Sequence, residues 1–153
     1  MAARILEVCD AVVAKLVADN PGLACRRVYA PDEDDAGGSY AVPQVRTVYV
    51  MPAAYGQDGT MTRAGDLNGR RVGVVVVTPL SVPPAVEEID AEVEFVQTAI
   101  YDVFSDPRNM PVLGAGEPGV WPDTAEVVSV YEPDELRRGV FVSQVDIGFR
   151  EVS

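Results

Sequence analysis

The chain contains no histidine and only one lysine, and each of these shortages excludes a class of function. Histidine is the commonest general base and metal ligand, so a Ser-His-Asp or Cys-His catalytic arrangement is impossible here. Twelve basic residues stand against 24 acidic ones, which gives a formal net charge of −12. Neutralising nucleic-acid phosphates and docking on anionic membranes both need clustered Lys and Arg. We expect neither kind of contact from this chain.

Cysteine is scarce, and nucleotide-binding loops and long apolar runs are missing. Cys9 and Cys25 are too few for a disulfide framework and form no Cys-x-x-Cys pair, which favours buried, inert thiols. No Gly-x-Gly-x-x-Gly or Gly-x-x-x-x-Gly-Lys-Ser/Thr motif is present. No apolar run approaches the ~20 residues that a bilayer requires, and Glu7 and Asp10 interrupt the first one. We therefore expect a soluble protein of a reducing cytoplasm, with no cofactor.

What is present predicts a single α+β domain over residues 1–153. The chain is 48% hydrophobic and 24% charged, an ordinary globular balance at a length that can bury a core. The order of its patterns predicts an antiparallel or mixed sheet of about four to five strands, packed with two helices. We expect helices at 3–19 and 85–105, and strands at 25–30, 45–51, 70–78, 124–131 and 140–150.

Apolar periodicity supports both helices. The second is the stronger prediction, because its valines and isoleucines follow alternating steps of three and four residues. The inward positions are Val86, Ile89, Val93, Val96, Ile100 and Val103, and the outward ones are Glu87, Glu88, Asp90, Glu94 and Gln97. In the first helix the inward positions are Ile5, Val8, Cys9, Val12 and Leu16.

Two strand patterns predict where the sheet is covered. The run from Arg71 to Val77 is apolar on both faces, as expected of a strand near the middle of a sheet. The last strand alternates, which predicts one buried and one half-exposed face. One face carries Phe141, Ser143, Val145, Ile147 and Phe149, and the other carries Gln144, Asp146 and Arg150. Residues 132–139 and the Gly/Pro-rich stretch 110–123 are expected to be connections, the latter with Trp121 as a core plug or, in the minority view, a ligand-stacking residue.

The stretch from Pro52 to Gly69 separates the two strands of a predicted hairpin and is far longer than the usual connection of about two to five residues. Lengthening a surface loop costs little closure entropy, so a tolerated insertion is one explanation. The other is an arm, Ala53–Asn68, that becomes ordered against another chain. A second unusual loop, Asp32–Asp35, offers oxygen ligands for a hard cation. Such a run is more often a solvated cluster of charges, and Pro43 stands where a calcium loop needs its bidentate Glu.

The pieces of the chain, in their order, resemble the tail terminator (tail-completion, neck) proteins of long-tailed bacteriophages and prophages. The resemblance covers essentially the whole chain and rests on overall pattern, and other head–tail joining proteins share much of it. It is carried by an amphipathic N-terminal helix beginning Arg4-Ile-Leu-Glu-Val-Cys9, the long-looped hairpin, the strand Arg71–Val77, the helix segment Val93–Ile100 and the strand Phe141–Arg150.

The resemblance implies a non-enzymatic virion protein that forms a ring, typically a hexamer. The ring caps the tail tube at the head-proximal end of the tail, is assembled in the host cytoplasm and presents a surface to the head connector or stopper protein. Genomic DNA would pass through without specific binding, since a negatively charged lumen repels it.

Two sets of contact residues follow as predictions. The arm would bind the tail tube through Tyr55, Asp58, Met61, Arg63, Asp66 and Leu67. Neighbouring subunits would meet through opposite charges, Arg70 and Arg71 against Glu87, Glu88 and Glu94. The alternatives are another head–tail adaptor, a metal-dependent hydrolase using Asp32, Asp34 and Asp35, and a small-ligand-binding domain around Trp121.

Overall fold

A computed structural model describes residues 4–29, 42–52, 69–106 and 119–152, with the backbone alone for 4–5, 69–70, 119–123 and 150–152. The predicted arm and the acidic run Asp32–Asp35 lie outside the described residues. The elements, in chain order, are α1 (Arg4–Asp19), β1 (Ala24–Arg27), β2 (Thr47–Pro52), β3 (Gly69–Pro79), α3 (Val86–Phe95), the π-helix η1 (Val96–Tyr101), α4 (Asp102–Phe104), β4 (Gly119–Ser129), α5 (Pro133–Arg137) and β5 (Val140–Val152).

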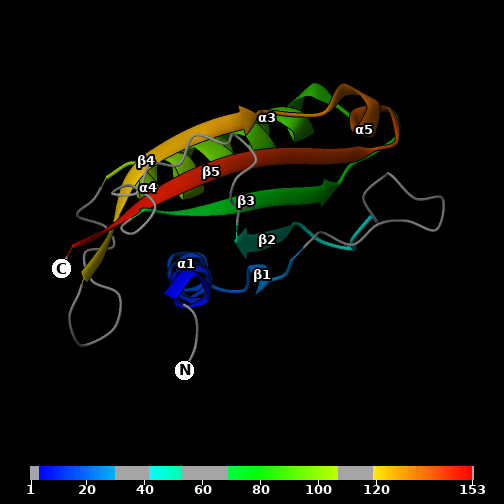
Figure 1. The fold of residues 1–153 in the computed structure, drawn as a ribbon. Helices are drawn as coiled ribbons and strands as arrows, with labels where there is room; N and C mark the ends of the chain where they lie inside the picture. Colours follow the sequence, from blue (N-terminus) through cyan, green and yellow to red (C-terminus); the bar gives the residue numbers. More distant parts are fainter. Residues whose placement is uncertain (1–3, 30–41, 53–68, 107–118, 153) are drawn as a thin grey trace.

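The described strands form one five-stranded mixed sheet in the order β1-β2-β3-β5-β4 (Figure 1). The β1 strand pairs in parallel with β2, and every other neighbouring pair is antiparallel. The segment from α3 to α4 runs behind the sheet in Figure 1, and α1 lies beside β1 and β2. The predicted α+β class is confirmed, with a mixed sheet and a third, short helix.

The main core lies between the helices and one face of the sheet. Each fully buried aliphatic or aromatic side chain contributes about 1.5–3 kcal/mol relative to an exposed one. Both predicted helix faces and the predicted inward face of β5 supply it. Its members include Val8, Val12 and Leu16 of α1, Val72, Val74 and Val76 of β3, Ile100, and Phe141, Val145, Ile147 and Phe149 of β5.

The opposite face of the sheet is also buried at its centre. Tyr49, Val75, Val77, Val140 and Val142 form a second cluster there, each at most 3% exposed. This confirms that β3 is a central strand covered on both faces. The face of β5 that was expected to be half-exposed is instead buried at the start of the strand, where Val140 and Val142 lie.

The second predicted helix, 85–105, is present but contains a π turn in its middle. The Asp102 N–H donates to the Gln97 carbonyl, the i→i+5 bond of a π-helix, which adds one residue to that turn. The buried positions therefore recur as Val96, Ile100 and Phe104, and Val103 is only half-buried. Val86 was predicted to face inward and is instead 67% exposed.

Other boundaries differ from the predictions near Gly and Pro. The predicted connection 110–123 is wrong at its end, because β4 begins at Gly119 and includes Trp121 in register with Arg150. The predicted connection 132–139 contains α5, which begins with Pro133 at its first position, where Pro is favoured. The first strand is shorter than predicted and ends at Arg27, and β2 begins at Thr47 rather than at Val45.

Candidate functional site

The predicted subunit-interface residues lie at opposite ends of the molecule. Arg70 and Arg71 are at the start of β3, in register with Phe149 and Gly148 near the end of β5. The acidic residues of α3 follow the end of β3. At ~3.4 Å per residue, the strand from Arg71 to its end at Pro79 spans roughly 27 Å. The fold therefore does not bring the two charged groups together within one chain.

The three glutamates of α3 have different surroundings. Glu87 and Glu94 are exposed. The Glu88 carboxylate accepts hydrogen bonds from the Ala85 N–H (3.0 Å), the Ser81 N–H (3.2 Å) and the Ser81 hydroxyl (3.2 Å). These bonds, the one from Ala85 first, lower the pKa of Glu88. Glu88 therefore fixes the start of α3, and its oxygens already have partners.

An ion pair that sequence reasoning missed, between the half-buried Arg46 and the buried Glu92, joins α3 to the sheet. The Arg46 guanidinium donates two hydrogen bonds to Glu92, at 2.8 and 2.6 Å, and the Thr78 hydroxyl donates a third at 2.6 Å. The guanidinium also lies 4.0 Å from the centre of the Phe95 ring. Glu92 is only 6% exposed. Glu92 lies three residues after Ile89 and four before Val96, and this spacing is the sequence signal that places it on the inward side of the helix.

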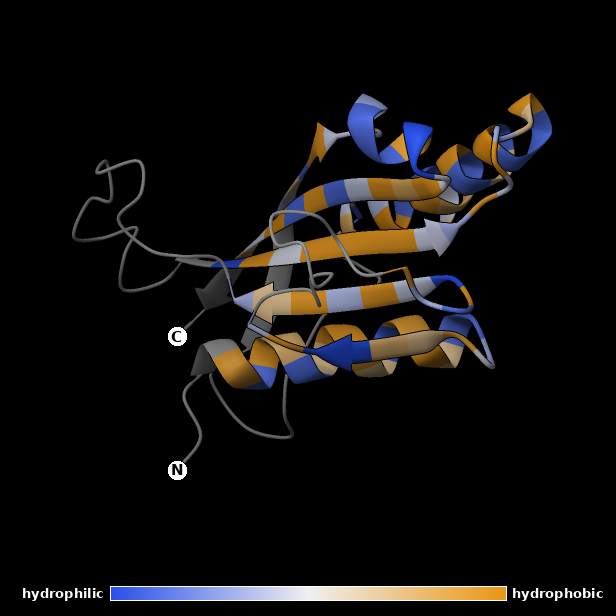
Figure 2. Cartoon of the chain, turned by 90° about the vertical axis from the view of Figure 1, so that its right-hand side faces the viewer, coloured by the Kyte–Doolittle hydropathy of each residue, from blue (hydrophilic) through white to orange (hydrophobic). Residues whose placement is uncertain are grey.

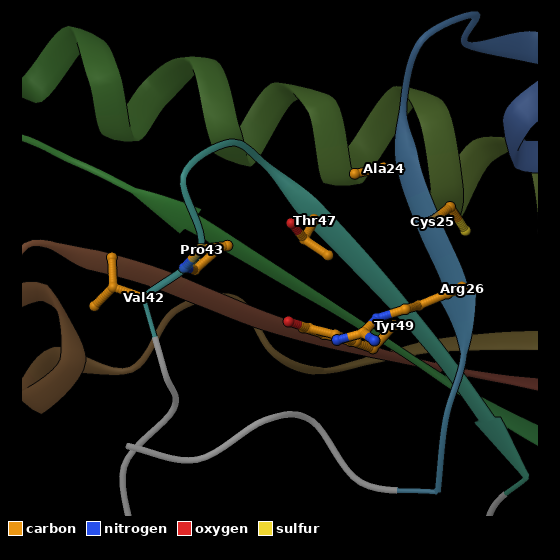
Figure 3. Close-up of a pocket in the computed structure, with 7 residues that line it drawn as sticks. All are labelled: Ala24, Cys25, Arg26, Val42, Pro43, Thr47 and Tyr49. Atoms are coloured by element: carbon orange, nitrogen blue, oxygen red, sulfur yellow. The ribbon is translucent and has the colours of Figure 1, made fainter. Parts of the chain in front are cut away.

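A pocket of about 350 Å³ lies on the second face of the sheet, at the β1 edge (Figure 3). The Arg26 guanidinium is 5.3 Å from the centre of the Tyr49 ring, a cation–π distance. Val42 and Pro43 approach from the segment before β2. The lining residues are Ala24, Cys25, Arg26, Val42, Pro43, Thr47 and Tyr49. Trp121 is in β4, at the opposite edge of the sheet, so the ligand site suggested for it is not this pocket.

Both cysteines were predicted to be buried and inert; the structure buries Cys9, whereas Cys25 is only half-buried. Burial raises the pKa of Cys9 and of Cys25 to about 11, which keeps both protonated near neutral pH. Both are free. Within the described ranges, no group of three or more Cys, Asp or Glu side chains could hold a metal ion. Residues Asp32–Asp35 and the arm residues Tyr55, Asp58, Met61, Arg63, Asp66 and Leu67 lie outside those ranges.

Comparison with known proteins does not identify a family. No protein-family model matches the chain, and no curated protein matches it. One solved structure, of a protein whose name states neither an activity nor an organism, is 17% identical. The match covers 100% of this chain and 97% of that one, with a TM-score of 0.46, which is too low to show a shared fold. Among the described helices, none is long and apolar enough to cross a membrane.

Proposed function

We propose that this chain is a structural virion protein, a tail terminator, that forms a ring on the tail tube and joins it to the head connector. The observation that carries the proposal is the separation of opposite charges along the sheet. Arg70 and Arg71 occupy the start of β3, and Glu87 and Glu94 belong to the helix that follows its end. Such groups can meet only between copies of the chain.

A contact between two different surfaces of the same chain is heterologous, and it closes into a ring when the rotation between copies allows. Arg71 and Glu87 are both exposed. Positions of opposite charge at opposite ends of one strand, Arg71 and Glu87, suit such a contact. The hexamer implied by the resemblance is the size that we propose.

The partners in this proposal are the tail tube protein and the head connector or stopper protein. The arm, Ala53–Asn68, connects the end of β2 at Pro52 to the start of β3 at Gly69 and would bind the tail tube. Genomic DNA would pass through the ring, and the net charge of −12 disfavours its adhesion by like-charge repulsion.

The proposal is tested by adding the purified chain to tails that lack it, taken from the phage or prophage that encodes it. We expect electron microscopy to show one ring at the head-proximal end of each tail, and sedimentation to show closed oligomers. Salt should weaken the assembly, because the Debye length is only ~8 Å at physiological ionic strength. A strict monomer at every concentration, with no rings on tails, contradicts the proposal.

Two alternatives give different results in the same experiments. Another head–tail adaptor would bind the isolated connector and not the tail tube. A metal-dependent hydrolase using Asp32, Asp34 and Asp35 would bind magnesium, calcium or manganese tightly and in stoichiometric amounts in a calorimetric titration.

A further inference from the structure

Large exposed hydrophobic side chains gather at one end of the sheet. Val45 precedes the start of β2, Val82 and Val86 follow the end of β3, and Val130 and Tyr131 follow the end of β4. Because β2 is antiparallel to β3, and β3 and β4 are both antiparallel to β5, these positions share one end, where α5 and the start of α3 also lie (Figures 1 and 2). We call these five residues the apolar end.

The apolar end is more than a scatter of single exposed side chains, which is normal on any protein surface. Nine large hydrophobic side chains are exposed in the described part of the chain, and five of them belong to this end, at 45–72% exposure. The segments that join strands to helices usually carry Gly, Pro, Asn, Asp and Ser instead. This concentration of valines therefore indicates a surface that a partner covers.

Hydrogen bonds from hydroxyl groups hold the backbone on two sides of the apolar end. The Thr47 hydroxyl donates to the Val45 carbonyl at 2.9 Å, and the Ser129 hydroxyl donates to the Tyr131 carbonyl at 3.1 Å. Valine is in addition stiff about its first side-chain torsion. A surface that is ordered before binding loses little conformational entropy on binding.

The segment between β3 and α3 is held in the same way. The Glu88 carboxylate accepts hydrogen bonds from the N–H groups of Ser81 and Ala85, at 3.2 and 3.0 Å. These two residues flank Val82, the most exposed member of the apolar end at 72%. The exposed valines are therefore displayed on an ordered backbone.

The charge around the apolar end is negative. Residues 80–94 and 130–139, which carry four of its five members, contain eight carboxylates and two arginines. The arginines of this end are paired with carboxylates, Arg46 with Glu92, Arg137 with Asp134 and Arg138 with Glu135. Asp90, one helical turn after Val86, and Glu132, next to Tyr131, are exposed. The apolar end therefore has an acidic rim.

The acidic rim decides which partners fit. Two copies of the chain that met through this end would place their carboxylates face to face, and like charges at an interface are unfavourable. Nucleic acid and anionic membranes carry the same sign of charge as the rim. A protein surface with apolar side chains bordered by lysine or arginine complements both the valines and the rim.

We infer that the apolar end is the docking site for a protein other than this chain, whose contact surface is apolar and bordered by lysine or arginine. The valines supply the affinity, because docking removes their apolar area from water. The rim speeds encounter with a basic partner and disfavours acidic ones. The inference goes beyond the proposed function, since it needs neither a ring nor a tail.

Three synthetic helical peptides of ~18 residues test the docking site on the full chain. The first has a leucine face bordered by lysine, the second has the same leucine face bordered by glutamate, and the third keeps the lysines but has alanine in place of leucine. The anisotropy of a fluorescent label on each peptide measures its dissociation constant. The variant Val45→Ser with Val86→Ser weakens the apolar end. The control Tyr29→Ser removes a side chain that is 72% exposed and follows β1, at the opposite end of the sheet.

We expect wild type and Tyr29→Ser to bind the leucine–lysine peptide saturably, with dissociation constants within about twofold of each other. The double valine variant should bind this peptide at least about tenfold more weakly, because it buries less apolar area. Wild type should bind each of the other two peptides at least about tenfold more weakly than the first. Replacing Asp90 by Asn and Glu132 by Gln should weaken binding of the first peptide and reduce its dependence on salt. Circular dichroism confirms that each variant is folded.

Four results overturn the inference. The first is that the leucine–lysine peptide does not bind, or binds no better than the alanine–lysine peptide. The second is equal binding of the leucine–glutamate peptide, and the third is a double valine variant that binds like wild type. The fourth comes from sedimentation velocity, if wild type forms oligomers that the double valine variant does not form, because a second copy then covers the apolar end. The peptide measurements use no tails, so they succeed or fail separately from the proposed function.

Discussion

At the scale of single residues, the contact of Arg46 and Thr78 with Glu92 is the polar feature that most constrains the fold. It joins the residue before β2, the end of β3 and the middle of α3. A charged pair of this kind is stabilising only while all of its members are present. The stacking of Arg46 on Phe95 shields one face of the guanidinium from water.

Replacing Glu92 by Gln should lower the free energy of unfolding by about 2–3 kcal/mol, because it leaves the Arg46 charge without its counter-ion. The partial exposure of Arg46, 33% of its side chain, keeps the loss below that of a fully buried pair. Urea denaturation at neutral pH measures the change. Glu94→Gln, on the exposed face of the same helix, should change stability by less than about 0.5 kcal/mol. Equal effects of the two variants would show that the contact of Glu92 with Arg46 contributes no more to stability than an exposed glutamate does.

The thiols predict a specific dependence of stability on pH. Burial raises the pKa of Cys9 and Cys25 from 9.0 to about 11 in the folded protein. Between these values the folded state binds more protons than the unfolded state, so the free energy of unfolding should fall as pH rises from about 9 to about 11. Urea midpoints across this range measure the fall.

The control is a Cys9→Ala, Cys25→Ala double variant, in which this part of the pH dependence should disappear. A second measurement is the rate of thiol labelling at pH 8, which should be slow in the native protein and fast after unfolding. Native thiols that react as fast as unfolded ones would contradict the burial argument.

At the scale of elements, two glycines end helices with positive φ angles but in different surroundings. Gly22 follows α1 with φ +86° and has nothing within 4 Å of an added Cβ. Gly139 follows α5 with φ +80°, and an added Cβ would lie 2.5 Å from Val82 and 3.1 Å from the Leu80 carbonyl. Comparing Gly22 with Gly139 separates the free-energy cost of a left-handed backbone conformation from the free-energy cost of a close contact.

We expect Gly22→Ala to destabilise the fold by about 1 kcal/mol, the cost of a left-handed residue with a Cβ. Gly139→Ala should cost about 3 kcal/mol, since overpacking adds to that conformational cost. Thermal and urea unfolding of both variants give the difference. If the two substitutions cost the same, the segment around Val82 moves aside freely.

The helix behind the sheet shows where sequence patterns stop being sufficient. Its existence, its length and its buried Val96 and Ile100 follow from apolar spacing. The π turn does not, because i→i+5 bonds depend on how both halves of the helix pack on the sheet. That turn brings Phe104 to the core, where it meets Phe149 with ring centroids 6.4 Å apart. The spacing of Glu92 from Ile89 and Val96 places it on the inward side of the helix, but its partners Arg46 and Thr78 come from other elements, so the ion pair was not predicted.

At the scale of the whole molecule, the central strand of the sheet was predictable and the strand order was not. The valine run of β3 predicts a central strand by composition alone. The strand order could not be predicted in this way, because the placement of β5 between β3 and β4 depends on contacts between residues that are distant in sequence.

Removing residues 55–66 and closing the gap with a short turn should abolish tail binding and change the melting temperature by less than about 3 °C. The reason is that a partner-binding segment gains its contacts from the partner and not from the core. Pelleting with purified tails and calorimetry measure the two effects. The matched control keeps the arm at full length and changes Tyr55, Met61 and Leu67 to Ser, which should reproduce the loss of binding. An unfolded deletion variant would place the segment in the core, and normal tail binding would make it a passive insertion.

The position of β5 also has a consequence for synthesis on the ribosome. Strand β4 pairs, within the described sheet, only with β5, and β3 needs β5 to cover one of its two edges. Until Val140–Val152 has left the exit tunnel, the nascent chain holds a central valine strand with one open edge, a template for pairing with other chains. The described sheet is therefore completed only when β5 has emerged, and any delay between the emergence of β3 and that of β5 leaves this edge open to pairing with other chains.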